Sequence, residues 1–235
     1  MNVPSIAAIK PKKLPLAAWS RGQALTLVAA VSACAWLRAA WPVALLALPS
    51  LLCLLVLGRG AFTPRARFGA ANAVTALRAL WTLTLTLPPS QLTHGWTVAI
   101  VSGVLALDLL DGWLARRNGD ASVFGAHFDM ETDALLVLVV TLRLWLGEGF
   151  GAWVLFAGGL RYVYVLWLWV WPGTGREAPR SRFGRFAFAA LMLGLCAGLG
   201  LPRTWGTLGV CLGTSVVTWS FARSCYFSRL AIPSS

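Results

Sequence analysis

The sequence predicts an all-α integral membrane protein, a polytopic bundle of eight membrane-spanning helices. Three observations support this fold class. Hydrophobic residues make up 58% of the 235 residues and charged residues only 12%, whereas soluble domains carry about 25% charged residues. Mean hydropathy is +0.71. Eight apolar stretches approach the length of about 20 residues that a helix needs to cross a bilayer. A soluble fold this poor in charge could not cover its own surface, which argues against a soluble domain and a disordered chain.

The expected spans lie at approximately 23–41, 42–57, 71–88, 95–116, 124–147, 151–171, 184–201 and 204–222. The first two are the least regular, because Arg38 falls near the end of the first and Trp41-Pro42 interrupts the pair. A re-entrant hairpin is the alternative for these two stretches. Lysines precede the first stretch as in a signal peptide, but another apolar run follows at once, so we expect it to be retained.

The spans divide the chain into five segments, which are a basic N-terminal segment (1–22), the first two spans (23–57), a basic linker (58–70), six further spans (71–222) and a tail (223–235). The linker, GRGAFTPRARFGA, combines three arginines with two phenylalanines. It either lies along the membrane interface as a short amphipathic segment or forms a solvated connection.

Basic residues are distributed unevenly between the connections. With eight spans, 15 of the Lys and Arg residues fall on one side and only Arg38 and Arg203 on the other. Basic loops remain cytoplasmic in membrane proteins. We therefore expect both termini of this multi-pass protein in the cytoplasm, and we predict a bacterial inner membrane as its location. The net charge of +12 then reflects topology and anionic lipid, and no nucleic-acid partner is expected.

Residues 108–133 carry the acidic side chains that point to function. Asp108 and Asp111 are three residues apart and Asp129 and Asp133 are four apart, so each pair occupies one face of a helix. A short turn joins the two helices, which we expect to be antiparallel neighbours with four converging carboxylates. Asp120, which follows Asn118-Gly119, is expected instead to cap the second helix.

Four converging carboxylates within a membrane repel one another and are costly to bury. Protonation or divalent cations would relieve that cost. Oxygen ligands alone suit hard ions such as Mg²⁺, Mn²⁺ or Ca²⁺. Two such cations would neutralise the four aspartates and leave coordination positions for phosphate oxygens, as in enzymes of phosphoryl transfer.

The pattern D-x2-DG-x2-AR-x8-G-x3-D-x3-D begins at Asp108 and ends at Asp133. It resembles the signature of the CDP-alcohol phosphatidyltransferase family at all eight specified positions and at every spacing. The resemblance implies a six-helix core, which 71–222 would supply, with the two spans of 23–57 as an N-terminal addition, and two cations, Mg²⁺ or Mn²⁺. The predicted topology places the aspartates, and so the active site, toward the cytoplasm. The resemblance implies transfer of a substituted phosphate from a CDP-linked lipid such as CDP-diacylglycerol to an alcohol, with release of CMP, in phospholipid biosynthesis.

The resemblance also implies roles for individual residues. Asp108, Asp111 and Asp129 would bind metal, and Asp133 would complete the second metal site and act as the general base. The CDP pocket would be lined by Gly112, Ala115, Arg116 and Gly125. Asn72, Thr75 and Arg78 fit a second family pattern, Asn-x2-Thr-x2-Arg, and would join that pocket. A polar helix start near the interface is the alternative for these three residues.

Three arginines are candidates for binding the acceptor alcohol. Arg161 lies within a span, where an isolated arginine needs an anionic partner. Arg182 and Arg185 lie in the next loop, close to a position where relatives carry a Gly-Lys pattern. They favour a phosphorylated acceptor, although positive-inside topology alone would also place arginines there.

A cation transporter and a catalytically inactive scaffold are the alternative functions. The aspartates of a cation transporter could form its binding site, but such proteins often contain internal repeats, and none is evident in this sequence. A catalytically inactive scaffold would not need the complete set of aspartates. The alcohol is not identified by the sequence, and a homodimer remains possible alongside the expected membrane-lipid partners.

The distribution of basic residues predicts the topology directly. Reporter fusions after Ser235 and within 172–185 should report a cytoplasmic location, and fusions near Ser90 and Gly149 an external one. A C-terminus found outside would mean that the number of spans is odd and that one of the first two spans is wrongly assigned.

Overall fold

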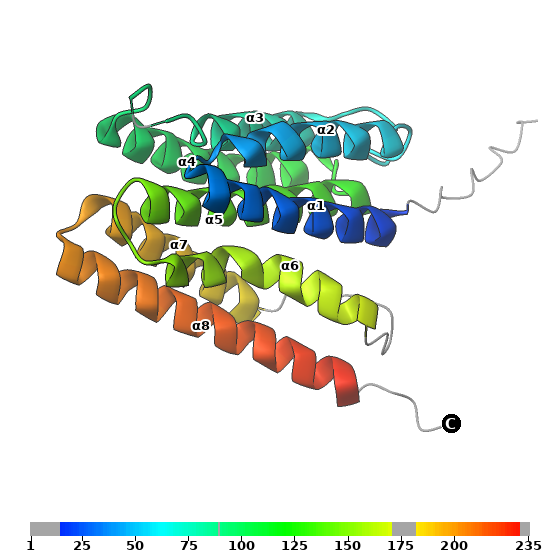
Figure 1. Ribbon diagram of the computed structural model, residues 1–235. Helices are drawn as coiled ribbons and strands as arrows, with labels where there is room; N and C mark the ends of the chain where they lie inside the picture. Colours follow the sequence, from blue (N-terminus) through cyan, green and yellow to red (C-terminus); the bar gives the residue numbers. More distant parts are fainter. Residues whose placement is uncertain (1–14, 89, 171–181, 231–235) are drawn as a thin grey trace, which may run out of the picture.

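The computed structural model describes residues 15–88, 90–170 and 182–230 and confirms the all-α class (Figure 1). The described residues form eight α-helices and one short 3₁₀ helix. In chain order these are α1 (Leu16–Leu37), α2 (Trp41–Leu57), α3 (Ala70–Thr84), α4 (His94–Asn118), α5 (Val123–Leu146), η1 (Ala152–Val154), α6 (Leu155–Val170), α7 (Arg182–Gly200) and α8 (Arg203–Leu230).

Three of the described helical stretches are long and apolar enough to cross a membrane. They are His94–Leu114, Ala152–Val170 and Phe183–Gly200. The stretch Trp41–Leu57 is also apolar but shorter. The chain is therefore a helical protein with candidate membrane spans, and the six-plus-two arrangement of spans stays a prediction.

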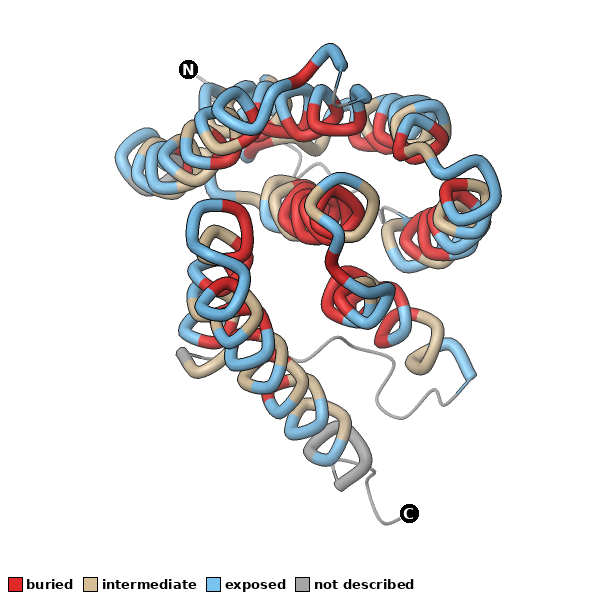
Figure 2. Tube along the Cα trace, turned by 60° about the vertical axis from the view of Figure 1, so that its left-hand side comes forward, coloured by how far each residue is buried: buried red, intermediate tan, exposed pale blue. Residues whose placement is uncertain are grey.

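Helix α5 is the centre of the bundle. All its residues from Glu131 to Leu144 are buried, and Figure 2 shows a central helix that is buried on all sides. It packs against α3, α6 and α7. A helix buried all round is enclosed by its neighbours, so Glu131 and Asp133 are held inside the protein.

The turn between α4 and α5 differs from the prediction in its capping residue. Ser122, and not Asp120, caps α5, because its side chain accepts a hydrogen bond of 2.9 Å from the backbone N–H of Gly125. Gly119 takes a positive φ of 63° in the turn. The helices α4 and α5 both pack closely against α3, so α3 provides the surface on which their carboxylates meet.

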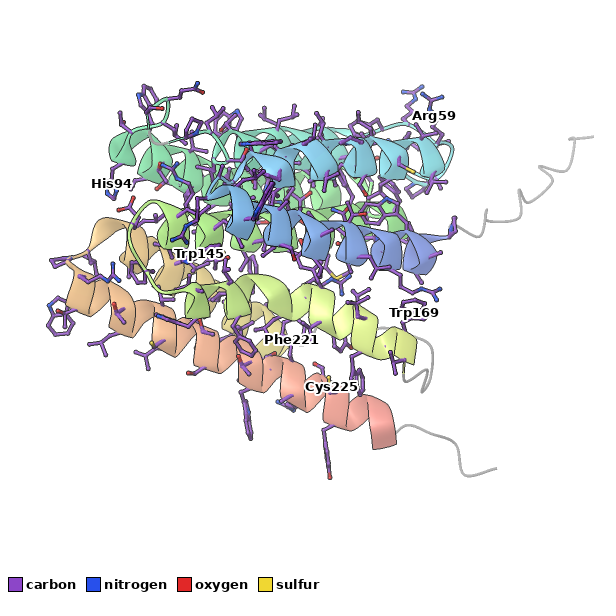
Figure 3. All side chains as sticks on the ribbon, viewed as in Figure 1. Arg59, His94, Trp145, Trp169, Phe221 and Cys225 are labelled. Carbon is purple, nitrogen blue, oxygen red and sulfur yellow. The ribbon has the colours of Figure 1, made fainter. Side chains whose placement is uncertain are left out.

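The two ends of the bundle carry different features. Helix α1 begins and α8 ends at the same end, where Arg59 and Trp169 also lie, and His94 and Trp145 lie toward the other end (Figures 1 and 3). At that other end the buried Arg143 donates hydrogen bonds to the backbone oxygens of Leu87 and Leu92, at 2.9 and 3.1 Å. Arg143 thereby fastens α5 to the loop between α3 and α4.

Helices α7 and α8 approach closely through glycines (Figure 1). A Cβ atom on Gly194 would collide with the backbone carbonyl of Gly209. Backbones this close exclude larger side chains, as at many interfaces between membrane helices. The pair therefore forms one unit that packs against the rest of the bundle.

The close approach of α7 and α8 makes Gly194 sensitive to substitution. Gly194→Ala should destabilise the protein by about 1–3 kcal/mol, because the added methyl group overpacks a backbone contact. Gly159→Ala is the matched control, since a Cβ there meets no atom within 4 Å. Thermal unfolding in detergent should show a lower Tm for the first variant only. Equal Tm values for both would contradict the close packing.

Candidate active site

Four aspartates converge on one arginine at the centre of the candidate site. The guanidinium of Arg78, on α3, lies 2.7 Å from Asp108, 2.5 Å from Asp111, 2.9 Å from Asp129 and 2.7 Å from Asp133. Its side chain is 1% exposed. The structure thus brings together all four carboxylates that the sequence predicts as a cluster, with Arg78 in their midst.

Three helices supply these side chains. Asp108 and Asp111 share one face of α4, and Asp129 and Asp133 share one face of α5, which follows from their spacing. On α3, Thr75 lies one turn before Arg78 and donates a hydrogen bond of 3.2 Å to Asp111. The second sequence pattern therefore places Thr75 and Arg78 in direct contact with the cluster.

The charges in the cluster are not balanced by Arg78. One guanidinium faces four carboxylates, and an excess of negative charge in a buried site is unfavourable. Ligand oxygens of Asp108, Asp111 and Asp129 all lie within 4.8 Å of one another. A donor set made only of carboxylate oxygens fits a hard divalent cation, so these residues could hold a metal ion.

The cluster is accessible from one side. The side chains of Asp108 and Asp129 are 32% and 22% exposed, whereas those of Asp111 and Asp133 are 9% and 8% exposed. A ligand would therefore reach the cluster past Asp108 and Asp129, and the two other carboxylates form its floor.

Of the residues predicted to line the CDP pocket, the structure brings Gly125 and Asn72 into contact. A Cβ atom on Gly125 would lie 3.0 Å from the side-chain oxygen of Asn72, so the glycine allows α3 and α5 to approach. Gly112 is half-buried on α4. Ala115 and Arg116 belong to α4, but their side chains lie outside the part of the chain that the structure describes.

Asn72 also organises the linker that precedes α3. Its amide donates hydrogen bonds to the backbone oxygens of Phe62 and Phe68, at 3.1 and 2.6 Å. Ser122 donates another to Phe62, at 2.6 Å. The ring of Phe62 packs edge-on against Phe124 of α5. The linker therefore folds over the starts of α3 and α5, beside the site.

The three arginines proposed for the acceptor are placed differently. Arg161 of α6 donates a hydrogen bond of 2.8 Å to Glu131, which also accepts one of 3.0 Å from Ser20 of α1. Arg185 is exposed near the start of α7, and the side chain of Arg182 lies outside the described residues. Arg161 is thus paired with Glu131, a carboxylate outside the cluster of four aspartates.

Sequence reasoning did not single out Glu131 or Ser20. A signal for Glu131 was present, because a carboxylate within an expected span is rare and needs a partner. Ser20 gave no comparable signal, since it lies more than 100 residues away in the chain. Only the packing of α1 against the bundle brings the two side chains together.

Comparison with known proteins supports the pattern described above. A family model described as CDP-alcohol phosphatidyltransferase matches residues 68–221, which include α3 to α7 and most of α8. No solved structure matches the chain.

Removal of the central arginine tests the charge balance of the site. Arg78→Ala leaves four carboxylates without their guanidinium, and breaking a buried ion pair costs about 3–5 kcal/mol. We expect a lower Tm in the presence of a chelator and partial recovery with millimolar Mg²⁺. Arg223→Ala, at an exposed position of α8, is the control. An Arg78→Ala protein that melts like wild type in chelator would contradict the account.

Proposed function

Because the chain belongs to the CDP-alcohol phosphatidyltransferase family, we propose that it transfers a substituted phosphate from a CDP-linked lipid to an alcohol. CDP-diacylglycerol is the proposed donor, and CMP is the second product. The observation that carries the proposal is the convergence of Asp108, Asp111, Asp129 and Asp133 on one buried point. These are the acidic positions of the family signature.

Two divalent cations, Mg²⁺ or Mn²⁺, are proposed as cofactors. Asp108, Asp111 and Asp129 would hold them, with Asp133 as a further ligand, and the proximity of the first three side chains supports this assignment. Bound cations would supply positive charge that polarises the donor diphosphate and stabilises the leaving phosphate.

The Arg78 guanidinium occupies the midst of the carboxylates in the structure. Cations of higher charge would compete with it for the same oxygens. We propose that Arg78 then turns from the carboxylates toward the donor diphosphate, to which an arginine can donate two parallel hydrogen bonds. Arg78 would in this way stabilise the metal-free protein and contribute to substrate binding in the loaded one.

The proposed chemistry assigns the remaining residues to two tasks. Asp133 would accept the proton of the acceptor hydroxyl as it attacks the phosphate, a role that needs a carboxylate within hydrogen-bond reach. Gly112, Ala115, Arg116 and Gly125 would bind the CDP group together with Asn72 and Thr75. The lack of a Cβ at Gly112, next to Asp111 in the chain, supports that role, and Gly125 contributes by allowing Asn72 to approach α5.

The acceptor side of the site is proposed at the start of α7. Arg182 and Arg185 would bind a phosphorylated alcohol through charge-assisted hydrogen bonds. The exposure of Arg185 is consistent with a group that meets a soluble substrate. Arg161 stays a predicted third residue of this kind, and its hydrogen bond to Glu131 also supports a role in positioning α5.

The aspartates and the cations are tested together. Asp108→Asn and Asp129→Asn each remove a ligand charge, so both variants should lose CMP release from CDP-diacylglycerol while remaining membrane-inserted. A chelator should abolish wild-type activity reversibly, with recovery in Mg²⁺ or Mn²⁺. Glu148→Gln, outside the cluster on the α5–η1 loop, should retain activity. Full activity in excess chelator would exclude a metal-dependent mechanism.

A further inference from the structure

We propose that α1 contributes to the active site through Ser20. Together with Glu131 and Arg161, Ser20 is a positioning residue that fixes the rotation of α5 about its axis. The three residues would thereby hold Asp129 and Asp133 toward α3. This inference rests on the proposed function, because it assigns these residues an effect on the metal site. Helix α1 lies outside the residues that match the family model.

The three positioning residues form a buried polar network. Glu131 receives a hydrogen bond of 2.8 Å from Arg161 and one of 3.0 Å from Ser20, both at the same carboxylate oxygen. The hydroxyl oxygen of Ser20 also lies 3.0 Å from Nε2 of His127. Since a hydroxyl has one hydrogen, a Ser20 that donates to Glu131 accepts from His127. Ser20, Glu131 and Arg161 are 2%, 3% and 9% exposed.

This network and the aspartate cluster lie on opposite faces of α5. Glu131 is two residues from Asp129 and two from Asp133, which in a helix is a rotation of about 200°. The contacts agree with this geometry, because the two aspartates meet Arg78 of α3, whereas Glu131 meets Ser20 of α1 and Arg161 of α6. Helix α5 is therefore held by ionic contacts on two opposite sides.

The apolar stretch of α5 between Asp133 and Arg143 is poorly suited to define the rotation of the helix around the aspartates. From Ala134 to Leu142 it is buried on all sides, and only Thr141 interrupts the apolar residues. Apolar packing tolerates exchange of side chains of similar size more readily than a buried charge tolerates loss of its partner. A rotation of α5 by one residue would break the contacts of Glu131 and of the aspartates together, so the paired charges select one orientation.

Helix α1 is well anchored at the level of Ser20. The neighbouring Trp19 donates a hydrogen bond of 3.0 Å to the backbone oxygen of Ser50 in α2 and packs edge-on against His127 of α5. Helix α1 also packs along α6. These contacts hold the Ser20 hydroxyl at a defined position, which a residue that orients Glu131 requires.

The test measures metal binding without relying on catalysis. The Kd for Mn²⁺ of the detergent-solubilised full chain, with CDP present, would be determined by electron paramagnetic resonance for wild type and for Ser20→Ala, Ser20→Thr and Ser32→Ala. Ser20→Ala should raise this Kd about 10-fold, the lower range for one hydrogen bond to a charged group. Ser20→Thr, which keeps the hydroxyl, should have the Kd of wild type. Ser32→Ala, at an exposed position of the same helix, should leave it unchanged.

Arg161→Gln provides the second arm. As a positioning residue, Arg161 should weaken Mn²⁺ binding when replaced and slow CMP release with every acceptor alike. A rise confined to the KM for a phosphorylated acceptor would overturn the positioning role and favour direct acceptor binding.

The outcomes separate this inference from the proposed function. Absence of Mn²⁺ binding in wild type would refute the proposed function. Mn²⁺ binding in wild type with an unchanged Kd in Ser20→Ala would refute the inference alone. The same holds if the Tm of Ser20→Ala falls while its Kd is unchanged, because a lower Tm by itself indicates only a structural contact.

Discussion

The contact between Arg78 and the four aspartates is the constraint on which the rest of the structure depends. Carboxylates from α4 and α5 meet on α3 because one guanidinium reaches all four of them. Without a cation at this point, like charges inside the bundle would repel one another. The same arrangement explains why the cluster suits divalent cations. Three of these carboxylates lie close enough together to hold one.

Helix α5 connects this site to the rest of the protein. One face carries Asp129 and Asp133, the opposite face carries Glu131, and farther along the helix Arg143 binds the α3–α4 loop. Its position at the centre of the bundle means that α1, α3 and α6 all contribute polar partners to it. Helix α1, which lies outside the residues that match the family model, therefore packs against helices inside that match.

Composition and spacing were sufficient to predict the helical class and the convergence of the aspartates, because helical periodicity alone assigns Asp108, Asp111, Asp129 and Asp133 to common faces. The sequence could not show that Arg78 is the residue on which they meet. It also suggested Asp120 as the cap of α5, where Ser122 is found. Competing cap residues two positions apart differ only in local backbone geometry, which residue types alone do not determine.

The pairing of side chains from distant parts of the chain was the second feature that the sequence did not predict. The spans could be ordered along the chain, but the partner of Arg161 depends on which helices pack side by side. Glu131 and Ser20 become visible only when α1, α5 and α6 are assembled. Contacts of this kind follow from tertiary packing and have no signature in local spacing.

The central claim is that the aspartate cluster transfers a substituted phosphate from a CDP-linked lipid to an alcohol. Purified protein incubated with CDP-diacylglycerol that carries a radiolabelled phosphatidyl group, and with a panel of alcohols with and without phosphate, tests it most directly. The account predicts a labelled lipid product and CMP in equal amounts, with one class of alcohol and only when Mg²⁺ or Mn²⁺ is present. Product formation that is independent of metal, or a lack of product with the whole panel in a protein that binds Mn²⁺, would contradict it.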